Sequence, residues 1–327
     1  MSQAVLVGDI GGTSSRLAIA ERLSDGHIVL SAFRHYSNDD FSEFSDVLGE
    51  YLSDLEAEAP PREALFAMAG PPAPEGSLKL VNRDWPTVNR QTLERLHHLD
   101  RALLVNDFAA MARSVPELPV SDFLRLLPGV PQDEAPVLVT GPGTGFGIGT
   151  LIRLRSGAFH VVTGEGGHAG YVARTPLEVE IAARMRDIYG YVCTEMIVSG
   201  GWLDCVCDIV CDIHGRPRES VSPEDILARA AADEAFCVDL CHVRANGILE
   251  AAGNAALVNG TKGGVVLTGA VAKGLTAWLG APQAVARFRE RGSHSDYMEK
   301  IPVSILTSAQ APLIGAAALY FEEELAR

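Results

Sequence analysis

Apolar and polar residues near the start of the chain predict two short strands joined by a turn of glycines. Residues 4–10, AVLVGDI, form an almost continuous apolar run, which is typical of a buried strand. Residues 14–20, SSRLAIA, alternate between polar and apolar, which is the spacing of a strand and not of a helix. We therefore expect the intervening glycines to join two strands. This pattern argues against the Rossmann and P-loop motifs, because both require a helix directly after the glycines.

The same pattern returns in the middle of the chain. Residues 137–154, VLVTGPGTGFGIGTLIRL, contain an apolar strand, a turn of glycine and threonine, and a second strand. Here Gly143-Thr144 repeats Gly12-Thr13 after 131 residues. Two such hairpins at the start of successive halves predict two similar α/β lobes facing one cleft. The pattern places the boundary between the halves near residue 106.

Strands and helices alternate along the rest of the chain. Apolar runs predict strands at 64–70 and 102–106, separated by an amphipathic helix at 90–99 with Leu93, Leu96 and Leu99 on one side. The second half predicts a helix at 176–190 with Leu177, Ile181, Met185 and Ile188 on one stripe, a buried helix at 236–259, a strand and glycine turn at 263–275, a strand at 303–307 and a closing helix at 312–325.

Charge and hydropathy narrow the classes of function. Acidic residues outnumber basic ones by 42 to 27, and the formal net charge of −15 produces a field that repels polyanions. Nucleic acids and anionic membranes are therefore poor candidates as partners. No apolar run approaches the roughly 18 to 20 residues of a membrane-spanning helix. Because no basic segment precedes the first apolar run, we expect a cytoplasmic protein.

All six cysteines lie between residues 193 and 241. They include no Cys-x-x-Cys pair and no zinc-knuckle spacing, so a structural zinc site is the less favoured interpretation. Cys207 and Cys211 are four residues apart in an apolar stretch, and so are Cys237 and Cys241. This spacing predicts reduced thiols that pack on helices.

The first glycine turn carries groups that suit a phosphate. Asp9 precedes Gly11, Gly12 and Thr13, so its carboxylate is expected to share space with the N–H groups of the turn. Such a turn can hold phosphate oxygens while the acid holds Mg²⁺ or its waters. The alternative is an Asx-turn that only closes the hairpin. The turn at residues 143–145 offers the same chemistry, and two such turns favour a nucleotide held from both lobes.

Asn106 and Asp107 stand where a predicted strand ends and a helix begins. Ligands of α/β sheets bind beyond the carboxyl ends of the strands, so Asp107 is placed to accept a proton from a substrate hydroxyl. The alternative is helix N-capping, for which Asn and Asp are among the best residues.

Three further segments carry candidate ligands. Glu165 and His168 lie among glycines in TGEGGHAG, where a carboxylate and an imidazole can hold several hydroxyls. The alternative is that both belong to a plain surface loop. Glu195 alone is typical of an acid that caps or solvates a helix. Gly269 marks a strand-to-helix corner that suits an adenine or a ribose, or a simple turn. Together these features predict phosphoryl transfer from a nucleotide to a hydroxyl compound.

The order of the motifs resembles the bacterial glucokinase family, the branch outside the ROK kinases within the fold of sugar kinases, actin and heat-shock ATPases. The resemblance rests on GDIGGTSSRLAI, NRDW, VNDFAAMA, GPGTGFG, GEGGH, EMIVSG and the closing IPVSI and APLIGAAA, and it covers nearly the whole chain. It implies an α/β fold with two lobes, which are duplicated ribonuclease-H-like (actin-like ATPase) domains, around a central cleft. The small domain would comprise residues 1–106 and 307–327, and the large domain residues 107–306.

The resemblance also implies roles for individual residues. Asp107 would be the general base for the 6-hydroxyl of the sugar, and Asp9 would face the metal. The other sugar hydroxyls would be held by Asn106, Glu165, His168 and Glu195. The ATP site would comprise Gly8, Asp9, Ile10, Gly11, Gly12, Thr13, Gly143, Thr144, Gly145 and Gly269. The implied cofactors are ATP and Mg²⁺, and the implied assembly is a homodimer.

We therefore expect an ATP-dependent glucokinase that makes glucose 6-phosphate for glycolysis. Two alternatives stay open: a kinase for another hexose or amino sugar, and a sugar-binding regulatory protein with little turnover. Both are motivated by departures from residues common in the family, at Ser14, Ser15, Gly170, Met196 and Ala270. The presence of Asp107 and both phosphate turns favours a kinase, because a protein that only binds sugar needs no base.

Overall fold

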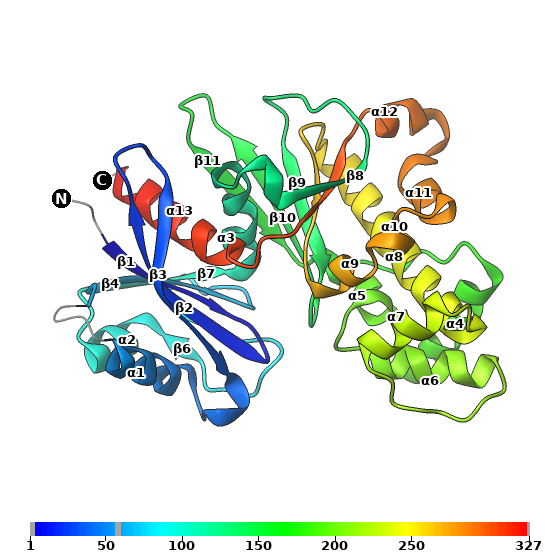
Figure 1. Ribbon diagram of the computed structural model, residues 1–327, viewed down its shortest axis with the longest axis horizontal. Helices are drawn as coiled ribbons and strands as arrows, with labels where there is room; N and C mark the ends of the chain where they lie inside the picture. The colour runs from blue at the N-terminus through cyan, green and yellow to red at the C-terminus, as the bar shows by residue number, and fades with distance from the viewer. Residues whose placement is uncertain (1–3, 56–59, 326–327) are drawn as a thin grey trace. The chain divides into compact units, whose positions relative to one another are not determined.

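A computed structural model describes residues 4–55 and 60–325. These residues form two compact units, which can be followed along the chain by colour in Figure 1. The first unit comprises the described residues of Met1–Val120, Leu154–Thr163 and Ser308–Arg327, and the second comprises Ser121–Arg153 and Gly164–Thr307. Both units contain strands and helices, so the α/β class expected from the sequence is confirmed.

The first unit is built on a sheet of five strands. Their order is β3 (Ile28–Ser37), β2 (Ser14–Arg22), β1 (Ala4–Ile10), β4 (Glu63–Met68) and β7 (Arg101–Asn106). β1 pairs antiparallel with β2 and parallel with β4, which pairs parallel with β7. The hairpin predicted around the first glycine turn is therefore confirmed. β5 (Ser77–Leu78) and β6 (Val88–Asn89) form a separate antiparallel pair.

Helices cover both faces of this sheet (Figure 1). The helices α1 (Phe44–Asp54) and α2 (Arg90–His97) pack on the face of β1 that carries Leu6 and Ile10. The opposite face, with Val5 and Val7, packs against α3 (Asp107–Ser114) and α13 (Ala311–Leu325). Burial of both faces of β1 explains why its residues form an almost continuous apolar run. The short 3₁₀ helices η1 (Asn38–Asp40) and η2 (Val115–Glu117) belong to the same unit.

The C-terminal helix holds residues 107–120 in the first unit. Gly315 of α13 lies against the backbone carbonyl of Ala110 in α3, where no Cβ would fit. Arg113 of α3 also forms an ion pair with Glu322 of α13, with 2.9 Å between Nε and the carboxylate oxygen. The sequence pattern places the boundary near residue 106, because it contains no sign of this contact between distant helices.

One expected core position of the first unit is exposed. Leu93 and Leu99 are buried, but Leu96, expected on the same side, is 51% exposed. The reason is that only a narrow stripe of the short helix α2 faces the core.

The second unit contains a sheet with the same arrangement of a hairpin and two parallel strands. Neighbouring strands in this sheet follow the order β10 (Phe146–Arg153), β9 (Val137–Pro142), β12 (Gly264–Leu267), β13 (Val303–Leu306) and β8 (Phe123–Leu127). β9 pairs antiparallel with β10 and parallel with β12, and β12 pairs parallel with β13. The second predicted hairpin is therefore confirmed. β11 (Phe159–Gly164) follows β10 along the chain, and its residues up to Thr163 belong to the first unit.

Helices make up most of the rest of the second unit. The α-helices are α4 (Pro176–Tyr189), α5 (Thr194–Val198), α6 (Leu203–Ile213), α7 (Pro223–Ala231), α8 (Ala235–Asn259), α9 (Ala270–Gly274), α10 (Thr276–Leu279), α11 (Pro282–Arg289) and α12 (Ser295–Glu299). The 3₁₀ helices are η3 (Val120–Asp122), η4 (Gly166–His168) and η5 (Gly292–His294).

The long helix α8 lies in the core of this unit, as its apolar composition predicts. The four cysteines of the two predicted pairs lie on α6 and α8 as buried free thiols, which confirms that they pack on helices. On α4, Ile181 and Met185 are buried, but Ile188 is 63% exposed because the last turn of the helix extends past the core. Among the described residues, no helix is both long and apolar enough to cross a membrane.

Candidate active site

The first glycine turn joins β1 to β2 and is closed by its own backbone. The N–H of Gly11 donates to the carbonyl of Ser14 over 2.9 Å. Asp9 lies just before this turn with its side chain 18% exposed, and Arg16 donates to its carboxylate over 3.3 Å. Burial raises the pKa of the Asp9 carboxyl, and Arg16 opposes part of that rise. Asp9 therefore contacts Arg16, and among the described residues its carboxylate accepts no hydrogen bond from the backbone of the turn.

Side chains from elsewhere in the first unit form hydrogen bonds to the backbone of this turn. Asn38 donates to the carbonyl of Gly11 over 2.9 Å and accepts from the buried hydroxyl of Ser15 over 2.7 Å. Arg83 donates to the carbonyl of Gly12 over 3.2 Å. The sequence pattern did not single out Asn38, and Arg83 entered only as part of the NRDW motif, without a role of its own. Ser15, noted only as a departure from the residue common in the family, is a buried hydrogen-bond donor to Asn38.

Asn106 and Asp107 lie at the junction of β7 and α3. The Asn106 side chain accepts from the N–H of Phe108 over 3.0 Å and donates to the carbonyl of Gly70 over 3.1 Å. Asp107, the first residue of α3, accepts from the same N–H over 2.9 Å. The capping role weighed from the sequence is therefore present. Each capping bond uses a single side-chain oxygen, and both side chains are only half-buried.

The strand register brings the two candidate segments of the first unit to one edge. Ile10 of β1 is level with Met68 of β4, which is level with Asn106 of β7. All three strands are parallel, so their carboxyl ends share an edge of the sheet. The structure therefore places the Asp9 turn and Asp107 at the edge where ligands bind in α/β sheets.

In the second unit, the turn at residues 143–145 is held by two further glycines. The N–H of Gly143 donates to the carbonyl of Gly145 over 2.9 Å. The N–H groups of Gly200 and Gly201 donate to the carbonyls of Gly143 and Thr144 over 2.8 and 2.9 Å. The sequence reasoning missed Gly200 and Gly201 as supports of this turn, although the pair of glycines in VSGG was a usable signal of a close backbone approach.

Gly269 lies against the start of this same turn. It precedes α9 with φ of +93°, a conformation that favours glycine. A Cβ at this position would collide with the backbone carbonyl of Pro142. The third glycine corner predicted from the sequence therefore packs on the turn of the second hairpin.

Glu165, His168 and Glu195 are brought together by pairing between two loops. The N–H of Thr194 donates over 3.0 Å to the carbonyl of Ala169, the residue that follows His168. On the other side, Glu195 accepts from the N–H of Phe146 over 2.7 Å. Glu165 is the N-cap residue of η4 and His168 is its last residue, and both are exposed to solvent. The two acids and the imidazole are thus held by one framework of the second unit.

The His168 ring and backbone have their own supports. Tyr191 donates from its hydroxyl to the carbonyl of His168 over 2.9 Å. The Sγ of Cys193 lies 3.9 Å from the Nδ1 of the His168 ring. These contacts fix the orientation of an exposed side chain, which reduces the conformational entropy that a ligand would otherwise have to remove.

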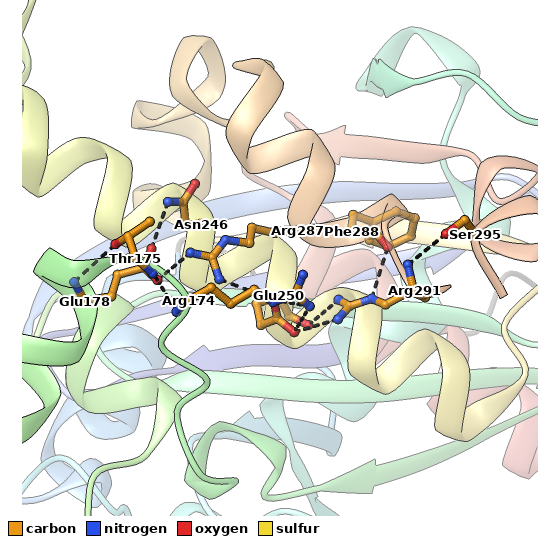
Figure 2. Close-up of polar contacts among 9 residues, drawn as sticks. All are labelled: Arg174, Thr175, Glu178, Asn246, Glu250, Arg287, Phe288, Arg291 and Ser295. Atoms are coloured by element: carbon orange, nitrogen blue, oxygen red, sulfur yellow. Dashed lines mark hydrogen bonds and ion pairs between the residues drawn. The ribbon is translucent and has the colours of Figure 1, made fainter. Parts of the chain in front are cut away.

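A buried network of charges in the second unit joins α4, α8 and α11 (Figure 2). Arg287 contacts both Glu178 and Glu250, and Arg291 and Arg174 also bind Glu250 over 2.6 and 2.8 Å. Burial raises the pKa of Glu178, but hydrogen bonds, first among them one from the backbone of Arg174, outweigh this and lower it overall. The network fixes the start of α4, which follows the His168 loop.

A cavity of about 160 Å³ opens within the second unit next to Gly269. Its walls are mainly apolar and come from α6, α7, α8, α9 and Leu275, with Gly200 also on its lining. Because Gly200 binds the backbone of Gly143, this cavity adjoins the glycine turn. Among the residues that the structure describes, no cluster of three or more His, Cys, Asp or Glu side chains is arranged to hold a metal ion.

Comparison with known proteins gives the relationship of the chain. The family model for glucokinase matches residues 6–323. A glucokinase of Nitrobacter hamburgensis is 32% identical over 97% of both chains. The crystal structure of a glucokinase from an Antarctic psychrotroph superposes with a TM-score of 0.81 at 28% identity, over 97% of this chain and 98% of that one. A Balamuthia mandrillaris glucokinase solved with glucose gives a TM-score of 0.79 at 23% identity, over 98% and 94%. This chain belongs to the glucokinase family.

Proposed function

We propose that this chain transfers the terminal phosphoryl group of ATP to the 6-hydroxyl of glucose. The observation that carries the proposal is the shared edge of the first sheet, where Asp107 and the Asp9 turn lie at the carboxyl ends of parallel strands. A general base and a phosphate-binding turn on one edge are what phosphoryl transfer to a hydroxyl requires. The glucokinases that this chain resembles support glucose as the acceptor.

In this proposal Asp107 accepts the proton of the 6-hydroxyl. Asn106, Glu165, His168 and Glu195 hold the other hydroxyls of the sugar. Support comes from the exposure of Glu165 and His168 and from the supports that fix His168 and Glu195. Hydroxyls that are held in one orientation gain from proximity, which is worth about 7 to 11 kcal/mol of barrier in favourable cases.

The nucleotide would be held by the two glycine turns and the cavity. We propose that residues 8–13 and 143–145 bind the phosphates and that Gly269 lies near the adenosine. The apolar cavity beside Gly269 supports this, because its walls suit a planar base. Asp9 would face Mg²⁺. One partly exposed carboxylate just before the glycine turn fits a cation whose remaining ligands are phosphate oxygens and water. Such an ion neutralises charge on the transferred group.

We further propose that both units are ribonuclease-H-like domains that contribute to one sugar site in a central cleft. The matching strand patterns β2-β1-β4-β7 and β10-β9-β12-β13 support a duplication. The first unit would be the small domain and the second the large domain. We also propose a homodimer in the cytoplasm, by analogy with the family.

The test is an assay of purified protein with MgATP and a panel of hexoses, following ADP release through a coupled enzyme. We expect turnover with glucose and formation of glucose 6-phosphate. A preference for mannose, fructose or an N-acetylated sugar would instead identify a kinase for another hexose or amino sugar. Saturable glucose binding without ADP release for any sugar would refute the proposal in favour of a regulatory sugar-binding protein.

A further inference from the structure

Arg244 is a buried cation in the middle of α8. The residue is only 5% exposed. Its Nη2 donates to the backbone carbonyls of Val198 and Ser199 over 2.9 and 3.2 Å, while its buried Nε has no hydrogen-bond partner among the described residues. No carboxylate of the described residues forms an ion pair with it. A buried guanidinium whose Nε–H has no acceptor is costly, because water no longer solvates it.

Other arginines of the second unit, unlike Arg244, contact carboxylates. Arg174, Arg287 and Arg291 each contact Glu178 or Glu250, as Figure 2 shows. Burial lowers the pKa of Arg244 to about 10, and the interaction with Cys241 opposes only part of that shift. The charge that completes the environment of the paired arginines is thus missing at Arg244.

The unpaired guanidinium lies on the wall of the 160 Å³ cavity. Leu203, Leu227, Leu240 and Val271 form much of the remaining wall, which suits the faces of a flat aromatic ring. Gly200, also on the lining, binds the carbonyl of Gly143 over 2.8 Å. A group in this cavity therefore lies next to the turn proposed to bind phosphate.

We propose that Arg244 is a specificity-determining residue that donates a hydrogen bond to an acceptor atom on the base of the nucleotide in this cavity. This inference rests on the proposed function, which puts ATP at the adjoining turn. A guanidinium only donates, so it recognises ring nitrogens or carbonyl oxygens and gives nothing to an exocyclic amine. The apolar walls bind the ring faces, and Arg244 selects bases by the position of an acceptor on the ring edge.

The experiment uses the whole chain and calorimetric binding of ADP, adenosine and inorganic tripolyphosphate. For Arg244→Met we expect ADP and adenosine to bind about 10- to 100-fold more weakly, as for loss of a hydrogen bond to a charged group. Tripolyphosphate, which has no base, should change less than threefold. Equal losses for adenosine and tripolyphosphate, or no loss for adenosine, would overturn the inference, because they mean that Arg244 only anchors the carbonyls of Val198 and Ser199.

Deaza analogues locate the contact and cover the case in which Arg244→Met does not fold. We expect one of 1-deaza-, 3-deaza- and 7-deaza-adenosine to bind to the wild type at least tenfold more weakly than adenosine does. In Arg244→Lys the same analogue should bind less than threefold more weakly than adenosine, since the planar fork is gone. Equal binding of all four ligands to the wild type would refute the proposal.

Arg289→Met is the matched control. Arg289 also donates to a backbone carbonyl, that of Pro128 over 3.2 Å, and also has a buried Nε without a partner, but it does not line the cavity. Its substitution should leave adenosine binding within twofold, and a loss equal to that of Arg244→Met would contradict the assignment. If the wild type turns over no hexose with MgATP, the proposed function fails, whereas the adenosine measurements still report on Arg244.

Discussion

Replacing Glu178 with glutamine removes a negative charge from a buried network of arginines. The Glu178 side chain is 1% exposed, and it accepts hydrogen bonds from the backbone N–H groups of Arg174 and Thr175 over 2.7 and 3.1 Å. The side chains of Asn246, at 2.9 Å, and of Arg287 also donate to it. All of these groups are donors. The amide of a glutamine would turn an N–H₂ group toward at least one of them, whichever way it is oriented.

The magnitude follows from this geometry. Breaking a buried ion pair by removing one partner costs about 3–5 kcal/mol, because the other charge stays buried. Arg287 would keep only its contact with Glu250, at 3.7 Å. With about 2–4 °C per kcal/mol for a domain of 150–250 residues, the melting temperature of the second unit should fall by about 6 to 20 °C at pH 7.

The dependence on pH provides a second criterion. The folded pKa of Glu178 lies below the ordinary value of 4.5, so its ionised form stabilises the fold fully above that value and loses this effect as the pH falls through the folded pKa. The difference between wild type and Glu178→Gln should therefore be largest at neutral pH and should shrink in acid.

Thermal unfolding followed by circular dichroism, from pH 7 down to the acid limit of the fold, measures both effects. Glu180→Gln on the same helix is the matched control, because Glu180 is 50% exposed and pairs with Arg184 only across the surface. Its cost should stay below about 1 kcal/mol. The reasoning would be refuted by a melting temperature of Glu178→Gln within 2 °C of wild type at pH 7, or by a difference that grows in acid.

Three further predictions follow from single side chains. Asp9→Asn should raise the melting temperature at pH 7, because burial raises the pKa of Asp9 and its ionised form is unfavourable above the ordinary value of 3.8. This gain in melting temperature should vanish below pH 3.8. Turnover with MgATP should fall in the same variant. A variant no more stable than wild type at pH 7 would contradict this. Gly269→Ala should lower the melting temperature and weaken ADP binding, since its Cβ meets the carbonyl of Pro142; unchanged melting would contradict the strain. Burial raises the pKa of Cys207 and Cys241 to about 12, so iodoacetamide at pH 8 should label them only in denaturant, as mass spectrometry would show; labelling of the folded protein would contradict their burial.

The parts of the fold that could be predicted from sequence are those with a local pattern. Both hairpins were predicted, because a strand and a glycine turn each leave a short-range signature, as in the apolar run of β1 and the alternation of β2. The long helix α8 was predicted from its length and apolar composition. Asn106 and Asp107 were placed correctly at a junction of strand and helix.

The parts that could not be predicted depend on contacts between distant residues. Nothing near residue 110 indicates that Gly315, some two hundred positions later, packs against it and draws α3 into the first unit. The support of the first turn by Asn38 and Arg83 has the same origin. Arg244 carries no local sign of being unpaired, because that depends on which acids the fold brings near.

The central claim is that Asp107 is the general base, and the most direct test measures Asp107→Asn with glucose. Asparagine keeps the size of the side chain and a capping oxygen but accepts no proton, so kcat should fall about 100- to 10,000-fold. The Kd for glucose, measured by quenching of intrinsic fluorescence or by calorimetry, should change less than about threefold. A variant that keeps more than a tenth of the wild-type kcat would contradict the claim, and so would a loss of glucose binding large enough to account for the lost turnover.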